Sequence, residues 1–469
     1  NEEARARKLH QQAHICDWAA IKEDIDVIPK LGTTKQYISP FLILSLEDVP
    51  EHHRLRSEIY AKANYPQKPL TSLAKPVSET HYKKSKLTKN HEAWRNSDRI
   101  KVGYFSPIFN QNPVSILSAR VLELHDKGRF EIFIFSYGKI INDRYMERLV
   151  TSEANIVDVS GMSDRQIAEL AVAKGIDIAI EFNGFLKGAR TGILAHRPAP
   201  IQINYLAYPG TMGADFIDYI IADDIIIPEE QKNFYSENII YLPNCYMPQD
   251  NTRKISNKLI SRADCGLPEN GFVFCCFNNS FKISPREFDI WMRLLIEVDG
   301  SVLWLMKANK WAETNLKNEA SSRGVNPKRL VFADQLPLEE HLGRMQLADL
   351  FLDTFNFNAH TTASDALWVG LPVLTKMGKG FAARVAGSLL TSIEIPELIT
   401  TSEEDYERLA LSLATEPDLL AKIKKKLADS RNYVPLFDTE TYTKNLEKAY
   451  VQAFQCYTNG MAPAEFKIL

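Results

Sequence analysis

The sequence alternates short apolar runs with longer amphipathic segments, and this alternation occurs twice along the chain. The first series starts with IKVGYF at residue 100 and continues through FEIFIFS, NIVDVS and IDIAIEF to about residue 243. The second starts with GFVFCCF at 271–277 and continues through SVLWLM, RLVFA, DLFLDT and LPVLT. Runs that are apolar on both faces and separated by helices predict buried parallel strands. Two such series predict an α/β protein of two Rossmann-like lobes with a cleft between them.

This pattern divides the chain into four parts. Residues 1–95 begin with a helical pattern and continue into a polar stretch rich in Pro and Lys, which predicts a short helical region and a connector. Residues 96–245 then form the N-terminal lobe, and residues 246–438 form the C-terminal lobe. The last segment, 439–469, predicts a helix that packs back on the lobes.

Charge and composition exclude several classes of partner. A net charge of −3, with Lys and Arg spread among acidic residues, leaves no basic stripe for nucleic acid. No segment reaches the roughly 18 apolar residues that span a bilayer, and no signal peptide is present, so we expect a cytoplasmic protein without a membrane partner. The chain starts at Asn1 rather than Met, which predicts a piece of a longer protein.

The segment DLFLDTFNFNAHTTASDALW holds the first candidate site. A buried strand ends near Asp353, and either Thr361 or Thr362 can cap a helix whose first turn contains Asp365. Free N–H groups and the positive end of the helix dipole make such a helix start a phosphate site, with His360 at its edge. The alternative interpretation is a well-capped helix beside a structural histidine.

The segment FNNSFKISP holds the second candidate site, between a strand and a helix. Lys282 could act as a point charge on a diphosphate, and Asn279 offers a hydrogen-bond donor. A solvated lysine in a strand-to-helix loop is an equally good interpretation. In PLEEHLGR, which follows Leu336, His341 falls one turn into a helix, where its ring could stack on a base or could be a partly buried surface side chain.

Two loops of the N-terminal lobe, 181–190 and 196–216, contain Gly and Pro residues and could line the facing wall, although turn formation alone explains Pro209. The sequence lacks Walker A, HExxH, GxSxG and GxGxxG motifs and has no carboxylate pair or cysteine spacing of metal-binding type. The charge of a diphosphate would therefore be met by Lys282 and the helix start at Thr361, which predicts a mechanism without a metal or other cofactor.

Read together, several segments resemble one known family. They are RPAPIQINYLAYPGTMGADFIDYIIAD, FNNSFKI, SVLWL, EEHLGRMQLADLFLDT, NAHTTASDALWVGLPVLT, ARVAGSLL and PLFDTETYTKNLE, and they occur in the family's order between about residues 98 and 457. The chain resembles the catalytic region of the protein O-linked N-acetylglucosamine transferase family, which includes SPINDLY-type fucosyltransferases and bacterial N-glycosyltransferases. Animal members of the family carry a large insertion between the lobes, and this chain lacks it, as bacterial members do. HQQAHICDWAAI resembles the segment that follows the family's tetratricopeptide repeats, which makes 1–95 a candidate remnant of that array.

The resemblance implies a GT-B fold and an inverting, metal-independent transfer from a UDP-sugar to a polypeptide, with the roles of individual residues taken from the matching motifs. By this match Lys282 holds the diphosphate, Asn279 lies beside the phosphates, His360, Thr361 and Thr362 contact phosphate and sugar, Asp365 binds the ribose, His341 stacks near the uracil and Leu336 offers backbone contacts to the base. Ala207 and Pro209 belong to the turn that the family places at the same site.

Three positions depart from the family pattern. Asn112 replaces a histidine of many relatives and cannot act as a general base, and Ala207 replaces a glycine. Phe357 replaces a small cysteine near the N-acetyl group of the donor. Because the larger side chain leaves less room for that group, we hypothesise a donor that lacks an N-acetyl group, such as UDP-glucose. No general base is assigned: Asp177 and Glu181 are candidates, and structural acids or proton transfer to water are the alternatives.

The resemblance predicts transfer of N-acetylglucosamine, or of a hexose such as glucose, to a Ser or Thr hydroxyl. Transfer of glucose to Asn is the alternative within the family. A sugar-nucleotide epimerase and a non-catalytic scaffold that binds a nucleotide sugar are alternatives from other classes.

Overall fold

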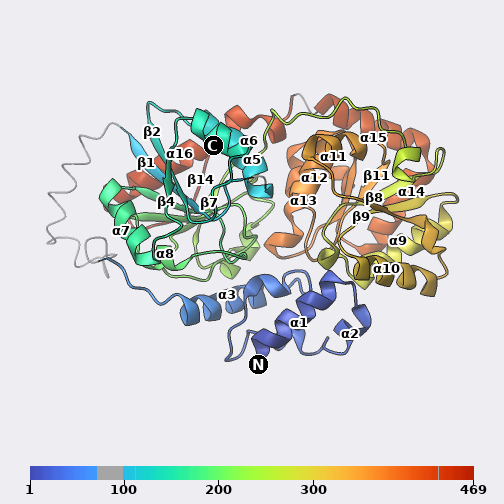
Figure 1. Cartoon of the computed structure of the whole chain (residues 1–469), viewed down its shortest axis with the longest axis horizontal. Helices are drawn as coiled ribbons and strands as arrows, with labels where there is room; N and C mark the ends of the chain where they lie inside the picture. Colours follow the sequence, from blue (N-terminus) through green and yellow to red (C-terminus); the bar gives the residue numbers. More distant parts are fainter. Residues whose placement is uncertain (71–98, 111, 431–432) are drawn as a thin grey trace. The chain divides into compact units, whose positions relative to one another are not determined.

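The computed structural model describes residues 1–70, 99–110, 112–430 and 433–469. These residues form two compact units, each made of several stretches of the chain (Figure 1). Unit 1 comprises Asn1–Ile38, Leu42–His52 and Thr252–Phe437, and unit 2 comprises Ser39–Phe41, His53–Asn251 and Asp438–Leu469. The predicted connector after residue 70 lies outside the described residues.

Unit 2 contains a parallel sheet whose strands follow the order β14-β7-β6-β5-β4-β1-β2-β3. These are β1 (Ile100–Ser106), β2 (Phe130–Ser136), β3 (Asn155–Asp158), β4 (Ile178–Glu181), β5 (Ile201–Asn204), β6 (Tyr219–Ala222), β7 (Asn238–Tyr241) and β14 (Phe466–Lys467). The register places Val102 of β1 beside Ile178 of β4. Both side chains are fully buried, as expected for strands between two layers of helices.

Several helices of unit 2 begin at capping residues. Asn112 accepts hydrogen bonds from the N–H groups of Val114 and Ser115, and Ser163 forms a capping box with Gln166. The helices are α3 (Pro50–Asn64), which belongs to unit 2 from His53 onward, α5 (Pro113–Leu124), α6 (Arg144–Thr151), α7 (Asp164–Lys174), α8 (Gly192–Ala195) and α16 (Thr439–Thr458), with η3 (Glu229–Phe234) as a 3₁₀ helix. Asn112 is therefore a helix cap.

The long helix near the C-terminus, α16, packs within unit 2. Glu447 accepts hydrogen bonds from His125 Nδ1 at 3.0 Å and from the N–H of Asp126 at 2.7 Å. The hydroxyls of Tyr104 on β1 and Tyr450 on α16 lie 3.0 Å apart. These buried contacts join the last part of the chain to the centre of the sheet in the same unit.

Unit 1 contains a second parallel sheet, in the order β10-β9-β8-β11-β12-β13. Its strands are β8 (Val273–Cys276), β9 (Val302–Met306), β10 (Leu330–Ala333), β11 (Leu350–Leu352), β12 (Val373–Lys376) and β13 (Ile399–Thr400). The chain moves from β8 outward through β9 to β10, then returns to β11 on the other side of β8 and continues to β13. The strand order therefore reverses between β8 and β11.

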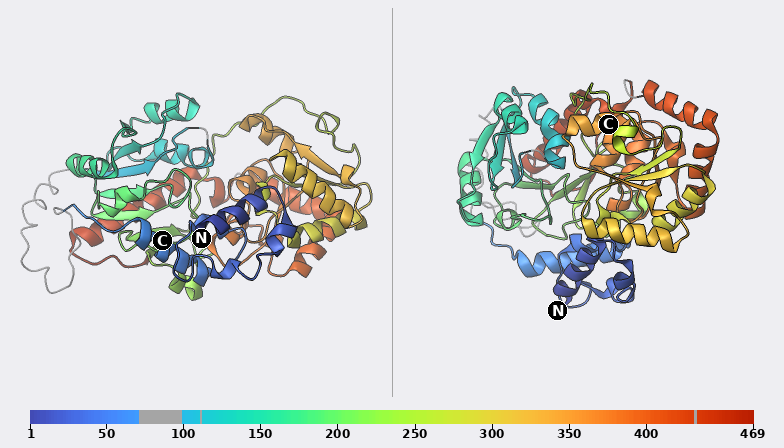
Figure 2. Two further views of the ribbon diagram at one scale, coloured as in Figure 1. Left: turned by 60° about the horizontal axis from the view of Figure 1, so that its bottom comes forward. Right: turned by 45° about the vertical axis from the view of Figure 1, so that its right-hand side comes forward.

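Helices surround this sheet and include the first two of the chain. They are α1 (Glu2–His14), α2 (Trp18–Lys22), α9 (Pro285–Glu297), α10 (Lys310–Ser322), α11 (Leu338–Met345), α12 (Thr361–Trp368), α13 (Val385–Ser392), α14 (Glu403–Thr415) and α15 (Pro417–Ser430). Short 3₁₀ helices are η1 (Ile28–Lys30), η2 (Pro40–Ile43, shared with unit 2), η4 (Ala263–Cys265), η5 (Ser280–Lys282), η6 (Pro327–Arg329), η7 (Phe381–Ala383), η8 (Pro396–Leu398) and η9 (Pro435–Phe437). Figure 2 shows α1 and α2, in blue, against the part of unit 1 that carries α9 and α10.

The predicted α/β class, with two parallel sheets and a helical N-terminal region, is confirmed. The first 70 residues contribute to both units, since α1 and α2 lie in unit 1 whereas most of α3 lies in unit 2. Among the helices of the described residues, none combines the length and apolar character that crossing a bilayer requires.

Candidate functional site

The loops that follow β8 and β11 contain most of the predicted site residues. In an open parallel sheet, a crevice forms at the carboxyl ends of two neighbouring strands whose connections leave in opposite directions. β8 and β11 are such a pair in unit 1. Lys282 follows β8, and the segment 353–365 follows β11, so the sheet brings these distant parts of the sequence to one edge.

Asn278 joins the two loops. Its Nδ2 group donates to Thr354 Oγ1 at 2.8 Å and to Asp353 Oδ1 at 3.3 Å, and its Oδ1 accepts from Thr362 Oγ1 at 2.7 Å. The side chain is buried and uses both ends of its amide. Asn278 therefore fixes the first turn of α12 relative to the loop that carries Lys282, a role that local sequence did not reveal.

Asp353, at the end of β11, shapes the loop before α12. Its Oδ1 atom accepts from the N–H groups of Thr354 at 2.8 Å and Ala359 at 2.6 Å, and its Oδ2 atom accepts from Thr375 Oγ1 at 2.7 Å. Burial raises the pKa of Asp353, while these hydrogen bonds and the charge of Lys282 oppose the increase. An acid directly after a buried strand is the sequence signal for this residue, although it does not identify the partners.

Lys282 lies at the end of η5 with 9% of its surface exposed. Its Nζ atom donates to the carbonyl of Asn358 at 2.8 Å and lies 4.0 Å from the ring centroid of Phe357. Burial lowers the pKa of Lys282, and the nearby Asp353 partly offsets this effect. An ammonium carries three N–H donors, so Lys282 can still bind an anion in surroundings of low dielectric.

His360 and the start of α12 lie beside Lys282. The ring centroids of His360 and Phe357 are 4.9 Å apart, and His360 Nε2 donates to the carbonyl of Ala382 at 3.1 Å. Burial and the positive charge of Lys282 keep the pKa of His360 well below its usual value, so the imidazole is neutral. His360 occupies the N-cap position without a side-chain cap, which leaves the first-turn N–H groups of Thr362 and Ala363 without that acceptor.

This combination suits a phosphate group. The start of a helix attracts anions through its N–H groups and its dipole, and Lys282 adds a full positive charge near the same point. Thr362 offers a hydroxyl whose hydrogen is directed to Asn278. The predicted residues Lys282, His360, Thr361 and Thr362 therefore come together on one edge of the sheet.

Asp365 faces a cation that sequence reasoning missed. Arg253 Nη1 lies 2.5 Å from Asp365 Oδ1, and Arg253 Nη2 donates to Ser364 Oγ at 3.3 Å. The guanidinium carbon is 5.2 Å from the ring centroid of Trp368. Burial raises the pKa of Asp365 to about 6, and Arg253 limits the increase. Arg253 thus holds the carboxylate to which the family resemblance gives the ribose.

His341 is neutral and lies against an aromatic ring. Its Nδ1 atom accepts from Arg344 Nε at 3.1 Å, and its ring lies edge-on to Phe277, with centroids 5.2 Å apart. Burial lowers the pKa of His341 to about 4, and Arg344 adds to the shift. A neutral imidazole is suited to stacking on a base. Leu336 is partly exposed just before α11, and Asn279 is exposed at the start of η5.

The remaining candidates lie in unit 2. Ala207 and Pro209 follow β5, in a turn where Asn204 Nδ2 donates to the carbonyl of Gly210 at 3.0 Å. Both residues belong to unit 2, whereas Lys282 and the residues around it belong to unit 1. Hydrogen bonds to the turn's own backbone, including one from the N–H of Gly210 to the carbonyl of Tyr208, hold its shape within unit 2.

The two candidate acids occupy opposite ends of β4. Asp177 precedes the strand, where its carboxylate accepts from the N–H of Lys101 at 2.8 Å, so it lies at the amino end of the sheet. Glu181 ends the strand, and its Oε1 atom accepts from the N–H groups of Asn183 at 3.0 Å and Gly184 at 3.1 Å. Burial raises the pKa of Glu181 to about 7. Of the two, only Glu181 lies at the edge where ligands bind in such sheets.

Comparison with protein families and curated proteins identifies relatives. The model of glycosyl transferase family 41 matches residues 50–262 and 251–446. The chain is 37% identical over 377 residues to a probable UDP-N-acetylglucosamine–peptide N-acetylglucosaminyltransferase of Arabidopsis thaliana, SEC, covering 79% of this chain and 39% of the relative. It is 28% identical over 479 residues to such a transferase of Caenorhabditis elegans, covering 78% of this chain and 42% of the relative. The chain thus spans about two fifths of the length of these relatives.

Solved structures show the same fold. An O-GlcNAc transferase of Thermobaculum terrenum matches with a TM-score of 0.78 and 25% identity, covering 90% of this chain and 77% of that chain. A glycosyltransferase of Rickettsia africae matches with a TM-score of 0.51 and 11% identity, covering 76% of this chain and 99% of that chain, which supports the fold alone.

Proposed function

Because the chain belongs to glycosyltransferase family 41, we propose that it transfers a sugar from a UDP-sugar to a polypeptide, with a Ser or Thr hydroxyl as acceptor. The observation that carries this proposal is the position of Lys282 beside the start of α12. Both lie at the carboxyl ends of β8 and β11, the neighbouring strands whose connections leave in opposite directions. The names of the relatives describe transfer of N-acetylglucosamine from its UDP form to peptides, which supports the donor and acceptor classes.

The groups around Lys282 are suited to stabilising a leaving diphosphate. The acceptor oxygen attacks the anomeric carbon from the face opposite the nucleotide, the bond from that carbon to the phosphate oxygen breaks, and UDP leaves with the electron pair. The acceptor proton passes to water or to the departing phosphate. Lys282 and the first-turn N–H groups of α12 meet the charge that develops on the leaving oxygen. This attack inverts the configuration of the sugar.

We propose that no metal ion takes part. The ammonium of Lys282 and the positive end of α12 supply the positive charge that a divalent cation provides in other transferases of UDP-sugars. His360 is neutral, and because its Nε2–H donates to Ala382, its Nδ1 atom can accept a hydrogen bond from a ligand. His360 can therefore orient a hydroxyl group of the sugar that is linked to the phosphate, without adding charge.

Phe357 favours a donor smaller than UDP-N-acetylglucosamine. Its ring contacts both Lys282 and His360, so a large apolar group occupies space beside the expected position of the sugar. Phe357 is buried and also lies against Phe281, with centroids 6.1 Å apart, which prevents the ring from moving away easily. This contact supports UDP-glucose as the second candidate donor.

The variant Phe357→Cys tests this choice of donor. Removing the ring opens space for an acetamide, so we expect the ratio of kcat/KM for UDP-N-acetylglucosamine to that for UDP-glucose to rise about tenfold. The control Phe332→Cys removes a ring that lies 5.3 Å from the Nζ atom of Lys317 in the same unit, and it should leave the ratio unchanged. Wild-type preference for UDP-N-acetylglucosamine, unaltered in Phe357→Cys, contradicts the proposal of a smaller donor.

Mass spectrometry of proteins coexpressed with the enzyme tests the acceptor class. We expect one hexose or one N-acetylhexosamine on Ser or Thr of polypeptides, and none when Lys282→Met replaces the wild type. Modification of Asn alone shows the alternative linkage. Purified protein that neither modifies polypeptides nor releases UDP from either donor contradicts a transferase, and conversion of the donor to an epimer with no release of UDP identifies the other enzyme class.

A further inference from the structure

The turn that carries Lys282 is held from outside by the first helices of the chain. η5 contains three residues, and Asn279 at its start makes no side-chain cap. So short a turn has little stability of its own, and its position depends on the groups that pack against it. Helix α1 is a major neighbour of η5 within unit 1. We call the packing of residues 10–18 against residues 280–283 the N-terminal contact.

Three hydrogen bonds cross the N-terminal contact. Ser280 Oγ donates to the carbonyl of His14 at 2.7 Å, and Trp18 Nε1 donates to the carbonyl of Ile283 at 3.2 Å. The thiol of Cys16 donates to the carbonyl of Ser280 at 3.7 Å. Both ends of the turn are thereby attached to the end of α1 and to the segment that follows it.

Aromatic packing adds to these bonds. The ring of Phe281 lies 5.2 Å from that of His10 and 4.8 Å from that of His14, between centroids. On its other side Phe281 lies against Phe357, whose ring is in contact with the Lys282 ammonium. Ser280, Phe281 and Ile283 therefore all contact residues 10–18, whereas Lys282 is directed to the phosphate site.

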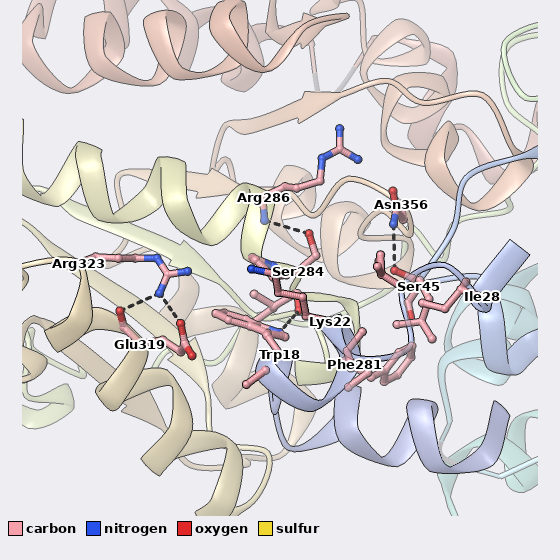
Figure 3. Close-up of a pocket in the computed structure, with 17 residues that line it drawn as sticks. Trp18, Lys22, Ile28, Ser45, Phe281, Ser284, Arg286, Glu319, Arg323 and Asn356 are labelled. Atoms are coloured by element: carbon pink, nitrogen blue, oxygen red, sulfur yellow. Dashed lines mark hydrogen bonds and ion pairs between the residues drawn. The ribbon is translucent and has the colours of Figure 1, made fainter. Parts of the chain in front are cut away.

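A pocket of about 570 Å³ opens beside this contact. Figure 3 shows Trp18 and Phe281 on its walls, with the dashed bond from the indole nitrogen of Trp18 to the loop before Ser284. The space next to the loop means that close packing does not fix the loop on that side. The bonds from Trp18 and to His14 therefore act together with the packing of Phe281 to place the turn.

From this arrangement we infer that Trp18 and Ser280 are positioning residues for Lys282. The N-terminal helices thus help to form the donor site by holding the turn that carries this lysine. Neither residue needs to touch the nucleotide. Each places the η5 turn so that the Lys282 ammonium meets the diphosphate. This inference rests on the proposed function, which assigns the diphosphate to Lys282.

The test compares ligands with and without a diphosphate. Trp18→Phe removes the N–H donor but keeps an aromatic ring against Phe288, and Ser280→Ala removes the hydroxyl bonded to His14. By titration calorimetry, each variant should bind UDP about threefold to tenfold more weakly than the wild type, the range expected for one lost hydrogen bond. Affinity for uridine, which lacks phosphate, should remain the same. A purely structural role would weaken both ligands together.

Ser301→Ala is the matched control. Its hydroxyl donates to the carbonyl of Val298 at 2.7 Å, the same distance as in the Ser280 bond, but at the amino end of β9. This variant should bind both UDP and uridine as the wild type does. Equal weakening of the two ligands in Trp18→Phe and Ser280→Ala, or UDP affinity within twofold of the wild type in both, overturns the inference.

A double-mutant cycle shows whether Trp18 acts through Lys282. Once Lys282→Met has removed the ammonium, adding Trp18→Phe should not weaken UDP binding further. An undiminished effect of Trp18→Phe in that background overturns the inference. If Lys282→Met alone leaves UDP affinity unchanged, the proposed function fails at its diphosphate assignment; if Lys282→Met weakens UDP and Trp18→Phe does not, only the positioning role fails.

Discussion

Replacing Lys282 by Met should lower activity without lowering stability. Met has a similar length and can pack on Phe357, but it carries no charge. A hydrogen bond to a charged group contributes about 1.5–3 kcal/mol, and a unit charge pair at 4 Å contributes about 4 kcal/mol at an effective dielectric of 20. Losing about 2–4 kcal/mol of transition-state stabilisation lowers kcat/KM by about 30-fold to 1,000-fold.

The stability change has the opposite sign because burial of the ammonium is unfavourable. The pKa of Lys282 is lower in the folded protein than in the unfolded chain, and each unit of such a shift corresponds to about 1.4 kcal/mol at neutral pH. Met avoids this cost but loses the bond to Asn358, which contributes about 1 kcal/mol. Asp353 loses a nearby cation but keeps its hydrogen bonds from Thr354, Ala359 and Thr375, and because burial raises its pKa to about 7 it can take up a proton. We therefore expect the Tm of Lys282→Met at pH 7 to equal or exceed that of the wild type.

The pH dependence follows from the same shift. Between the folded and unfolded pKa values, the unfolded lysine binds a proton that the folded one has released, so wild-type stability rises as the pH increases through that interval. Any advantage of Lys282→Met at pH 7 should therefore shrink towards pH 10. Differential scanning fluorimetry at several pH values measures this change.

Initial rates of UDP release with a donor sugar nucleotide provide the activity assay. Lys317→Met serves as a control, because Lys317 is a surface lysine of unit 1 that pairs with Glu313 at 2.6 Å. It should change neither kcat/KM nor Tm by a measurable amount. A value of kcat/KM for Lys282→Met within threefold of the wild type refutes the assignment, as does a large fall in Tm, since the residue would then be mainly structural.

Two further predictions concern buried acids. Arg253→Met leaves Asp365 buried without its cation, so we expect a lower Tm by scanning fluorimetry. We also expect titration calorimetry at pH 7.5 to show UDP affinity reduced about tenfold. Unchanged UDP affinity would show that the pair has no part in nucleotide binding. Glu181→Gln should become more stable relative to the wild type between pH 5 and pH 8.5, by about 1–3 kcal/mol. The folded pKa of Glu181 is raised to about 7, so the wild type loses stability as the pH rises towards that value. Parallel melting curves of the two proteins across this range would contradict it.

The fold was predictable because it depends on local patterns. Apolar runs such as GFVFCCF became central strands, since this signal lies within a few neighbouring residues. The start of α12 was predicted to within one residue, but the predicted cap at Thr361 or Thr362 is wrong, because His360 holds the N-cap position. The order of the strands was not contained in these patterns. The position of β8 beside β11 depends on tertiary packing, and it is this pairing that brings Lys282 to the start of α12.

The same limit explains the residues that sequence reasoning missed. The partners of Asn278 lie 75 to 84 residues away, and Arg253 meets Asp365 across 112 residues, so no spacing rule could have connected them. Phe357 illustrates an intermediate case. Resemblance to the family marked the position as unusual, but only the structure shows that its ring lies on the Lys282 ammonium.

The central claim is that Lys282 and the start of α12 bind the diphosphate of a sugar nucleotide without a metal ion. Titration calorimetry of the wild type with UDP, in buffer containing EDTA, tests it most directly. We expect saturable binding at one site per chain, with affinity unchanged when Mg²⁺ or Mn²⁺ replaces EDTA. Absence of binding in EDTA, or binding that appears only with the divalent cation, would contradict it.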